Sequence, residues 1–267
     1  KPYFRTMQNQ SFHYLIRIQY LGFRYSGWQT QPDQKTIEQM LLKTLRFVFP
    51  DLNYKILGAG RTDSKVSALD AAFELFLENK PIDDCDKFLK CFNQNLPSDI
   101  RALEINEIDD NFNILQNSKF KEYIYLFSFG TKNHPYCAPF MANIYEELNI
   151  DLMKKAAKLF EGEHDFAAFT AQMQEGAKSV RTIELCEIRK NALLQANFFP
   201  DTSYALHVKG KGFMRYQIRM IMGALIQVGK GILSIENIES YLEHSNTKKL
   251  NYIAPGSGLH LFQVEFN

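Results

Sequence analysis

Apolar and polar positions change their spacing along the first half of the chain, and each spacing predicts an element. Apolar residues three and four apart predict helices at residues 36–48 and 82–92, because a helix face repeats every 3.6 residues. Thr36 and Gln39 have the spacing of a capping box at the start of the first helix. Alternating or short apolar runs predict four strands, at residues 12–20, 52–57, 66–77 and 100–108. The order is β-α-β-β-α-β, the ferredoxin-like arrangement.

The second half repeats this order. The expected strands are residues 122–129, 182–189, 204–209 and 259–266. Helices are expected at residues 151–160 and 213–228, and an extra helix at 234–242 has Ser234 as its N-cap. We therefore predict an α+β fold of two tandem ferredoxin-like halves, residues 1–118 and 119–267. Their antiparallel sheets should meet at a central cleft.

Composition narrows the class of protein. With 267 residues and 45% hydrophobic residues, the chain can bury one large core or two modest ones. The net charge of +1 means that any nucleic-acid site must come from local clustering of basic residues. No apolar run approaches the roughly 18 residues of a membrane span, and no signal-peptide pattern opens the chain. We therefore expect a cytoplasmic protein without a membrane segment.

No motif for a metal or a cofactor stands out. The four cysteines form no C-x-x-C pair and have no histidine at zinc-ligand spacing, so reduced thiols are expected. There is also no P-loop and no dinucleotide-binding fingerprint. The chain is expected to act without metal or cofactor.

The sharpest local motif is Gly58-Ala59-Gly60-Arg61-Thr62-Asp63, between a short and a long expected strand. Its two glycines allow a tight turn or the close approach of a ligand. The turn would present the guanidinium of Arg61 and the carboxylate of Asp63. The alternative is a hairpin connection in which Thr62 and Asp63 only bond the local backbone.

An aromatic strand face follows at residues 121–127. Tyr123, Tyr125 and Phe127 alternate, so they share one face of a strand. Such a face suits stacking on an unpaired base, and Tyr123 is expected at the cleft because it begins the strand. The alternative is an ordinary core face of the sheet.

A basic segment spans residues 207–219 and contains no acidic residue. Its glycines mark the passage from a strand into a helix, and helix N-termini with basic neighbours bind phosphate. Arg215 and Arg219 are four apart, so they are expected on one helix face. The alternative is an amphipathic helix with a solvated basic face.

Taken in order over residues 20–266, these segments resemble the tRNA pseudouridine synthase A (TruA) family. The resembling segments are Gly27-Trp28-Gln29, Gly60-Arg61-Thr62-Asp63, Tyr123-Ile124-Tyr125, Gly162-Glu163-His164-Asp165-Phe166, Val180-Arg181-Thr182, Phe213 through Arg219 to Gly223, and Gly258-Leu259. The resemblance implies an isomerase that converts uridine to pseudouridine in the anticodon stem-loop of tRNA, without cofactor, as a homodimer.

The resemblance also implies roles for single residues. Asp63 matches the catalytic aspartate, and Arg61 the arginine that helps to displace the target base. Tyr123 matches the tyrosine that stacks on the uracil and is a candidate proton acceptor. Arg219 matches the basic residue that pairs with the aspartate and keeps it ionised. The tRNA backbone is expected across a basic, RNA-binding cleft formed by Arg24, Lys178, Arg181, Lys209, Lys211 and Arg215.

Three departures from the family pattern concern RNA contacts more than chemistry. Lys65 stands where the family has a glycine. Leu21 replaces the aspartate of a Tyr-Asp-Gly segment. Residues 113–116 lack the arginine of a His-Ala-Arg-Phe segment, so a basic residue is missing near Leu115.

Other readings stay open at the level of sequence. One is a non-catalytic RNA-binding protein with two ferredoxin-like halves, although the expected aromatic RNA-recognition motifs are missing. A second is a synthase that modifies another uridine, and a third is a two-domain small-molecule enzyme. The sequence also leaves open whether Asp63 attacks C6 of the uracil or C1′ of the ribose, or assists an elimination route.

Overall fold

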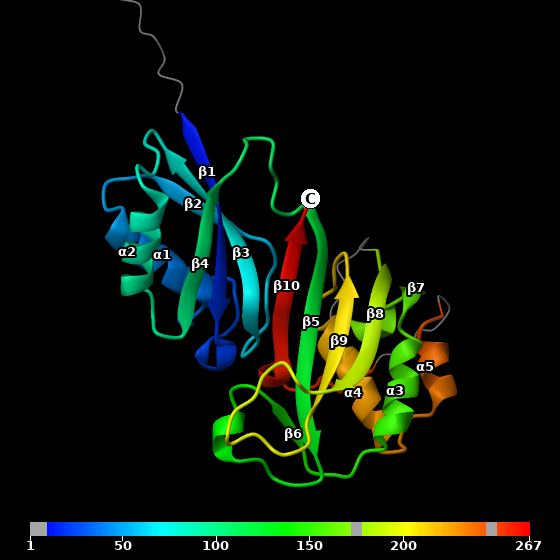
Figure 1. The fold of residues 1–267 in the computed structure, drawn as a ribbon. Coiled ribbons are helices and arrows are strands. Elements are labelled where there is room, and N and C mark those ends of the chain that lie inside the picture. Colours follow the sequence, from blue (N-terminus) through cyan, green and yellow to red (C-terminus); the bar gives the residue numbers. More distant parts are fainter. Residues whose placement is uncertain (1–9, 172–177, 244–249) are drawn as a thin grey trace, which may run out of the picture.

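A single ten-stranded sheet runs through both halves of the computed structural model, which describes residues 10–171, 178–243 and 250–267 (Figure 1). The elements of the first half are β1 (Ser11–Tyr20), α1 (Ile37–Val48), β2 (Tyr54–Gly58), β3 (Ser67–Glu78), α2 (Cys85–Asn95) and β4 (Ile100–Glu107). Those of the second half are β5 (Ser118–Phe129), β6 (Ala142–Ile144), α3 (Ile150–Lys158), β7 (Gly162–Asp165), β8 (Val180–Lys190), β9 (Tyr204–Gly210), α4 (Gln217–Gly229), α5 (Ile235–Tyr241) and β10 (Leu259–Phe266).

The strands follow the order β4-β1-β3-β10-β5-β9-β8-β7, with β2 also on β3 and β6 also on β5. One edge of β3 is shared by two partners. Residues 73–77 pair with β2, whereas Ser67 and Ala68 pair with β10. The chain between β2 and β3 therefore leaves the sheet beside the place where β10 joins it. This geometry brings residues 59–66 to the joint between the halves.

The joint corrects one expectation. The predicted halves had separate antiparallel sheets, but β3 and β10 run parallel and pair through Ser67–His260 and Ala68–Leu261. The sheet is thus continuous and mixed. Pairing satisfies backbone groups that an exposed strand edge would leave free, which favours the fusion. The ferredoxin-like character of each half stays a prediction.

Most predicted elements are present, with shifted ends. Asp84 caps α2, so this helix begins at Cys85 and not at Ile82. Tyr216 has a left-handed backbone (φ 63°), so α4 begins at Gln217, four residues after the predicted start. Arg215 is therefore outside the helix, and the expected helix face shared with Arg219 is wrong. The short strands β6 and β7 were not predicted, because three and four residues are too few to show a period.

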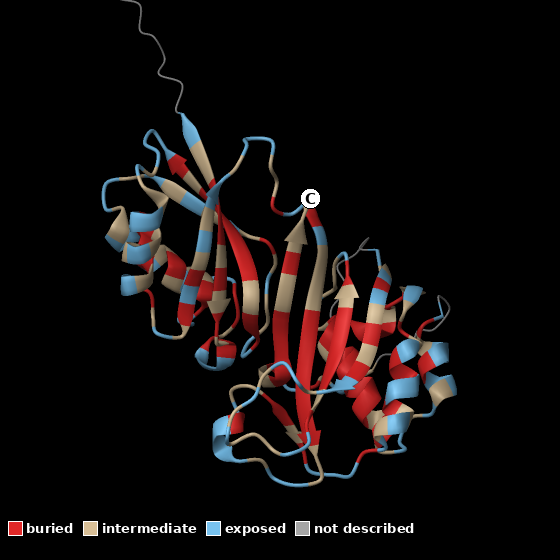
Figure 2. Ribbon diagram, in the orientation of Figure 1, coloured by how far each residue is buried: buried red, intermediate tan, exposed pale blue. Residues whose placement is uncertain are grey.

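The core lies between the sheet and its helices (Figure 2). All residues of α4 are buried except Arg219 and Gln227. The alternative of an amphipathic helix with a solvated basic face is therefore wrong. A helix that is apolar on nearly all sides packs into the core, and α4 carries Arg219 toward the joint between the halves.

Candidate active site

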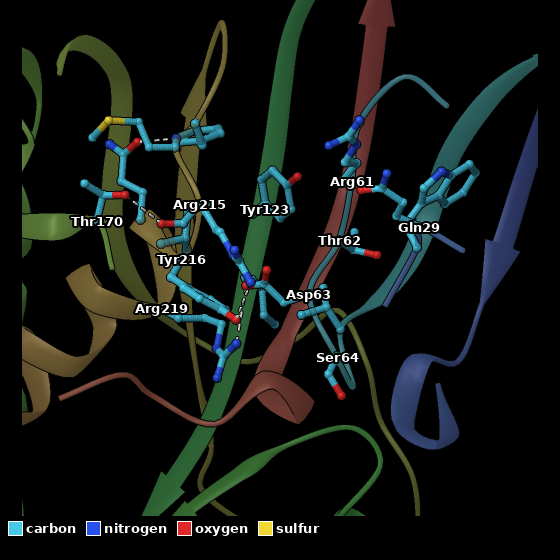
Figure 3. A pocket seen from close by; sticks show the side chains of 18 of the residues that line it. Gln29, Arg61, Thr62, Asp63, Ser64, Tyr123, Thr170, Arg215, Tyr216 and Arg219 are labelled. Carbon is cyan, nitrogen blue, oxygen red and sulfur yellow. Dashed lines mark hydrogen bonds and ion pairs between the residues drawn. The ribbon is translucent and has the colours of Figure 1, made fainter. Parts of the chain in front are cut away.

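A cavity of about 1180 Å³ opens at the joint and is lined by residues from both halves (Figure 3). The first half contributes the turn at residues 60–66, including Asp63. The second half contributes Tyr123 from β5 and the segment 213–219 that leads into α4. The three segments that stood out in the sequence thus meet in one cavity.

Backbone hydrogen bonds fix the turn that carries Asp63. The amide of Trp28 donates to the carbonyl of Thr62 (3.0 Å), and the amide of Lys65 donates to Tyr25 (3.0 Å). Gly27 has φ 106°, and a Cβ there would lie 2.7 Å from the carbonyl oxygen of Thr62. Position 27 therefore requires glycine so that the two loops can touch.

The departure at Lys65 leaves the turn intact. Lys65 has φ 66°, a left-handed conformation that glycine adopts without cost. The backbone thus has the geometry expected of the family's glycine, with a lysine side chain added. Leu115 is exposed in the β4–β5 connection, and neither it nor Asn113 lines the cavity.

Asp63 faces a cation across the joint. Nη1 of Arg219 lies 3.3 Å from Oδ2 of Asp63, and Nε of the same guanidinium donates to the carbonyl of Ala254 (2.8 Å). Both side chains are largely buried, with 21% of Asp63 and 15% of Arg219 exposed. Burial raises the pKa of the Asp63 carboxyl above its ordinary value, while Arg219 and then Arg215 act in the opposite direction.

Tyr123 lies in the same buried environment. Its ring is 9% exposed and packs edge-on against Phe213, with ring centres 5.5 Å apart. Burial, followed by the charge of Asp63, raises the pKa of the Tyr123 phenol well above its usual range. The phenol is therefore protonated at neutral pH, so its oxygen can accept a proton only when its own phenolic proton passes on to another group.

The structure brings only some of the expected basic residues to the cavity. Arg61, Lys178, Arg181 and Arg215 line it together with Arg219. Arg61 is exposed and forms no ion pair within residues 10–171, 178–243 and 250–267. A guanidinium with no protein partner there can reach a substrate.

Arg24, Lys209 and Lys211 lie outside the cavity lining. Arg24 pairs with Asp99, and its Nη2 donates to Oδ1 at 2.8 Å. Lys209 lies 3.6 Å from Glu184 and 3.7 Å from the ring centre of Phe120. These three residues therefore do not line the cavity, and their part in the expected basic cleft for the tRNA backbone stays a prediction.

The polar residues of the cavity that were missed include Lys121 and Gln217. Lys121 is on β5, and its Nζ donates to the carbonyl of Ala59 (2.7 Å). Lys121 lies two residues before Tyr123 and so on the same strand face, and this spacing could have identified it from the sequence. The buried amide of Gln217 accepts from Met214, and its Nε2 has no partner among the described residues. Gln217 lies inside the basic segment 207–219, but nothing in the sequence distinguishes it from its neighbours there.

Within the described residues, no three His, Cys, Asp or Glu side chains gather where they could hold a metal ion. No helix there is long and apolar enough to cross a membrane.

Comparisons with known proteins agree on one family. The sequence model of a family described as "tRNA pseudouridine synthase" matches residues 156–267. The protein named tRNA pseudouridine synthase A 2 of Bacillus anthracis is 32% identical over 254 residues, which cover 95% of this chain and 99% of the relative. The protein named tRNA pseudouridine synthase A of Aquifex aeolicus is 30% identical over 252 residues, covering 94% and 98%.

Among solved structures, that of an archaeal box H/ACA sRNP Nop10–Cbf5 complex is 15% identical and covers 83% of this chain and 55% of the other. Its TM-score of 0.33 is too low to support a conclusion about fold or function.

Proposed function

Because the chain belongs to the tRNA pseudouridine synthase A family and is an isomerase acting on tRNA uridines, we propose that it modifies the anticodon stem-loop with Asp63 as its nucleophile. The observation that carries the proposal is the Asp63–Arg219 ion pair in a cavity shared by both halves. A cation beside a largely buried carboxylate favours its ionised form, and the ionised form is the one that attacks carbon.

The reaction breaks the N1–C1′ bond of uridine, turns the base, and joins C5 to C1′. The proton on C5 leaves and N1 regains one, so the product is an isomer and no redox equivalent is consumed. Asp63 attacks C1′ or C6, or assists the elimination route. After C5 bonds to C1′, loss of its proton restores the conjugated ring. Tyr123 accepts that proton only as its own phenolic proton passes on to water, because its raised pKa keeps the phenol neutral.

The target base must leave the RNA stack to reach Asp63. Unstacking costs a few kcal/mol, and stacking on an aromatic ring such as Tyr123 returns about 1–3 kcal/mol. Arg61, exposed at the cavity rim, takes the vacated place in the RNA. The volume of the cavity, about 1180 Å³, supports the proposal, because it exceeds that of one nucleotide.

Tritium release from tRNA carrying 5-³H-uridine tests the nucleophile. The wild type is expected to release tritium, and Asp63→Asn to release none while still folding and binding tRNA. Asp51→Asn, an exposed carboxylate away from the cavity, is the control and should match the wild type. Tritium release by Asp63→Asn at the wild-type rate would show that the nucleophile is another residue.

The choice of uridine needs its own experiment. Modified positions in tRNA from a strain lacking the protein should lose pseudouridine in the anticodon stem-loop. Loss elsewhere would favour a synthase for another tRNA uridine, the alternative that the missing basic residue near Leu115 keeps open. A homodimer and a cytoplasmic location are also proposed, and sedimentation of the purified protein tests the first.

A further inference from the structure

Lys121 is a cavity cation that the proposed chemistry does not use. It precedes Tyr123 by two residues on β5, and both side chains line the cavity. Its ammonium donates to the carbonyl of Ala59, at the base of the turn that carries Asp63. Lys121, on a strand of the second half, thus forms a hydrogen bond with the turn of the first half that carries the nucleophile.

The charge of Lys121 has no carboxylate partner among the described residues. No ion pair involves it there, and burial alone lowers the pKa of its ammonium. Asp63 does not neutralise it, since the cations that act on Asp63 are Arg219 and Arg215. A partly buried cation without a counter-charge is costly to keep, and an anionic ligand would reduce that cost.

The surroundings leave room for such a ligand. The bond to Ala59 uses one of three ammonium protons. Gly60 has no side chain there, and a Cβ at this position would lie 3.1 Å from Nζ of Lys121. The next residue is Arg61, a second cation at the cavity. The only anionic group of a nucleotide in RNA is its phosphodiester.

We propose that Lys121 binds a phosphodiester oxygen next to the target uridine and so positions that nucleotide over Asp63. The proposal rests on the proposed function, because it assumes that a uridine in RNA enters this cavity. The carbonyl of Ala59 orients the ammonium, and Gly60 lets the RNA backbone approach. Tyr123 and Lys121 then hold the base and the phosphate of one nucleotide from a single strand.

The first test uses the wild-type protein and needs no variant. A stem-loop RNA with one 5-³H-uridine at the proposed target position is compared with two RNAs that carry a single neutral methylphosphonate on the 5′ or on the 3′ side of that uridine. One of the two is expected to bind roughly 10- to 100-fold more weakly, as for a lost charged hydrogen bond. Equal binding of all three RNAs would overturn the proposal.

The second test asks whether Lys121 is the partner of that phosphate. Lys121→Met should bind the unmodified RNA as weakly as the wild type binds the methylphosphonate RNA, with no further loss when the two changes are combined. Lys121→Arg keeps the charge and should remain sensitive to the methylphosphonate. The control is Lys119→Met on the same strand, whose exposed ammonium pairs with Glu265. It should behave as wild type.

A role confined to holding the turn gives another result. Lys121→Met would then bind both the unmodified and the methylphosphonate RNA more weakly than the wild type does, by the same factor. This outcome would contradict phosphate binding. A wild type that releases no tritium from the unmodified RNA would instead overturn the proposed function. The failures of the two proposals are thus distinguishable.

Discussion

At the scale of single residues, the carboxylate of Asp63 is subject to opposed influences. Burial favours its neutral form, whereas Arg219 and Arg215 favour its charge. The pKa of Asp63 still lies above its ordinary value of 3.8. The nucleophile is therefore more basic than a solvated aspartate, which suits attack on carbon.

This balance predicts the pH dependence of the reaction. The ionised fraction of Asp63 falls as the pH drops through its raised pKa, so single-turnover tritium release should have an acidic limb above pH 3.8. Arg219→Met removes the main cation that lowers this pKa, so the limb should move to higher pH. Arg24→Met, outside the cavity, should leave it in place. If the acidic limb of the pH profile stays in place in Arg219→Met, a group other than Asp63 causes it.

Lys65 shows how one residue can depart from a family pattern without changing the backbone. Its left-handed conformation (φ 66°) costs about 1–2 kcal/mol for a residue with a Cβ. Glycine avoids this cost but loses more entropy on folding. Lys65→Gly should therefore be more stable than Lys65→Ala by about 1 kcal/mol, measured by urea unfolding. The alanine variant controls for losing the ammonium from the ring of Phe23. Equal stabilities would mean that the turn is unstrained.

At the scale of elements, helix starts depend on local chemistry that the sequence displays. Oγ1 of Thr36 accepts from the amide of Gln39 (3.3 Å), as predicted for α1, although the reciprocal bond of a capping box is not seen. Ser234 forms a full capping box with Asn237 at α5. The start of α4 was not predictable, because a tyrosine rarely adopts a left-handed conformation without tertiary contacts.

The cap of α1 gives a prediction for stability. Thr36→Ala removes the acceptor at a fully buried position and should lower the free energy of unfolding by about 1 kcal/mol. Thr36→Ser keeps the oxygen and should cost less. Denaturant unfolding of both variants measures the difference. Equal losses for serine and alanine would show that the threonine methyl, which both variants lack, matters and the cap does not.

At the scale of the whole molecule, charge is distributed unevenly. The net charge is only +1, yet five arginine and lysine residues near the nucleophile, besides Lys121, line one cavity: Arg61, Lys178, Arg181, Arg215 and Arg219. Such a concentration attracts phosphates without making the protein a polycation.

Binding of tRNA should therefore weaken steeply with salt. Each phosphate contact adds about 0.7–0.9 to the slope of log affinity against log salt. Arg181→Ala should weaken binding and reduce that slope by about 1. Arg24→Ala should change neither, because Asp99 holds this guanidinium away from the cavity. A flat salt response of the wild type between low and physiological salt would contradict a basic cleft.

The sequence by itself determined the order of the longer elements, without β6 and β7, and three of the segments that line the cavity, because periodicity, glycines and clustered charges are local properties. It also marked Asp63, Tyr123 and Arg219 through their motifs. Only the tertiary structure decided that β10 joins β3, that Arg24 and Lys209 pair elsewhere, and that Lys121 reaches Ala59. Those outcomes depend on contacts between residues far apart in the chain, and no local pattern encodes which partner a strand edge or a charged side chain will find.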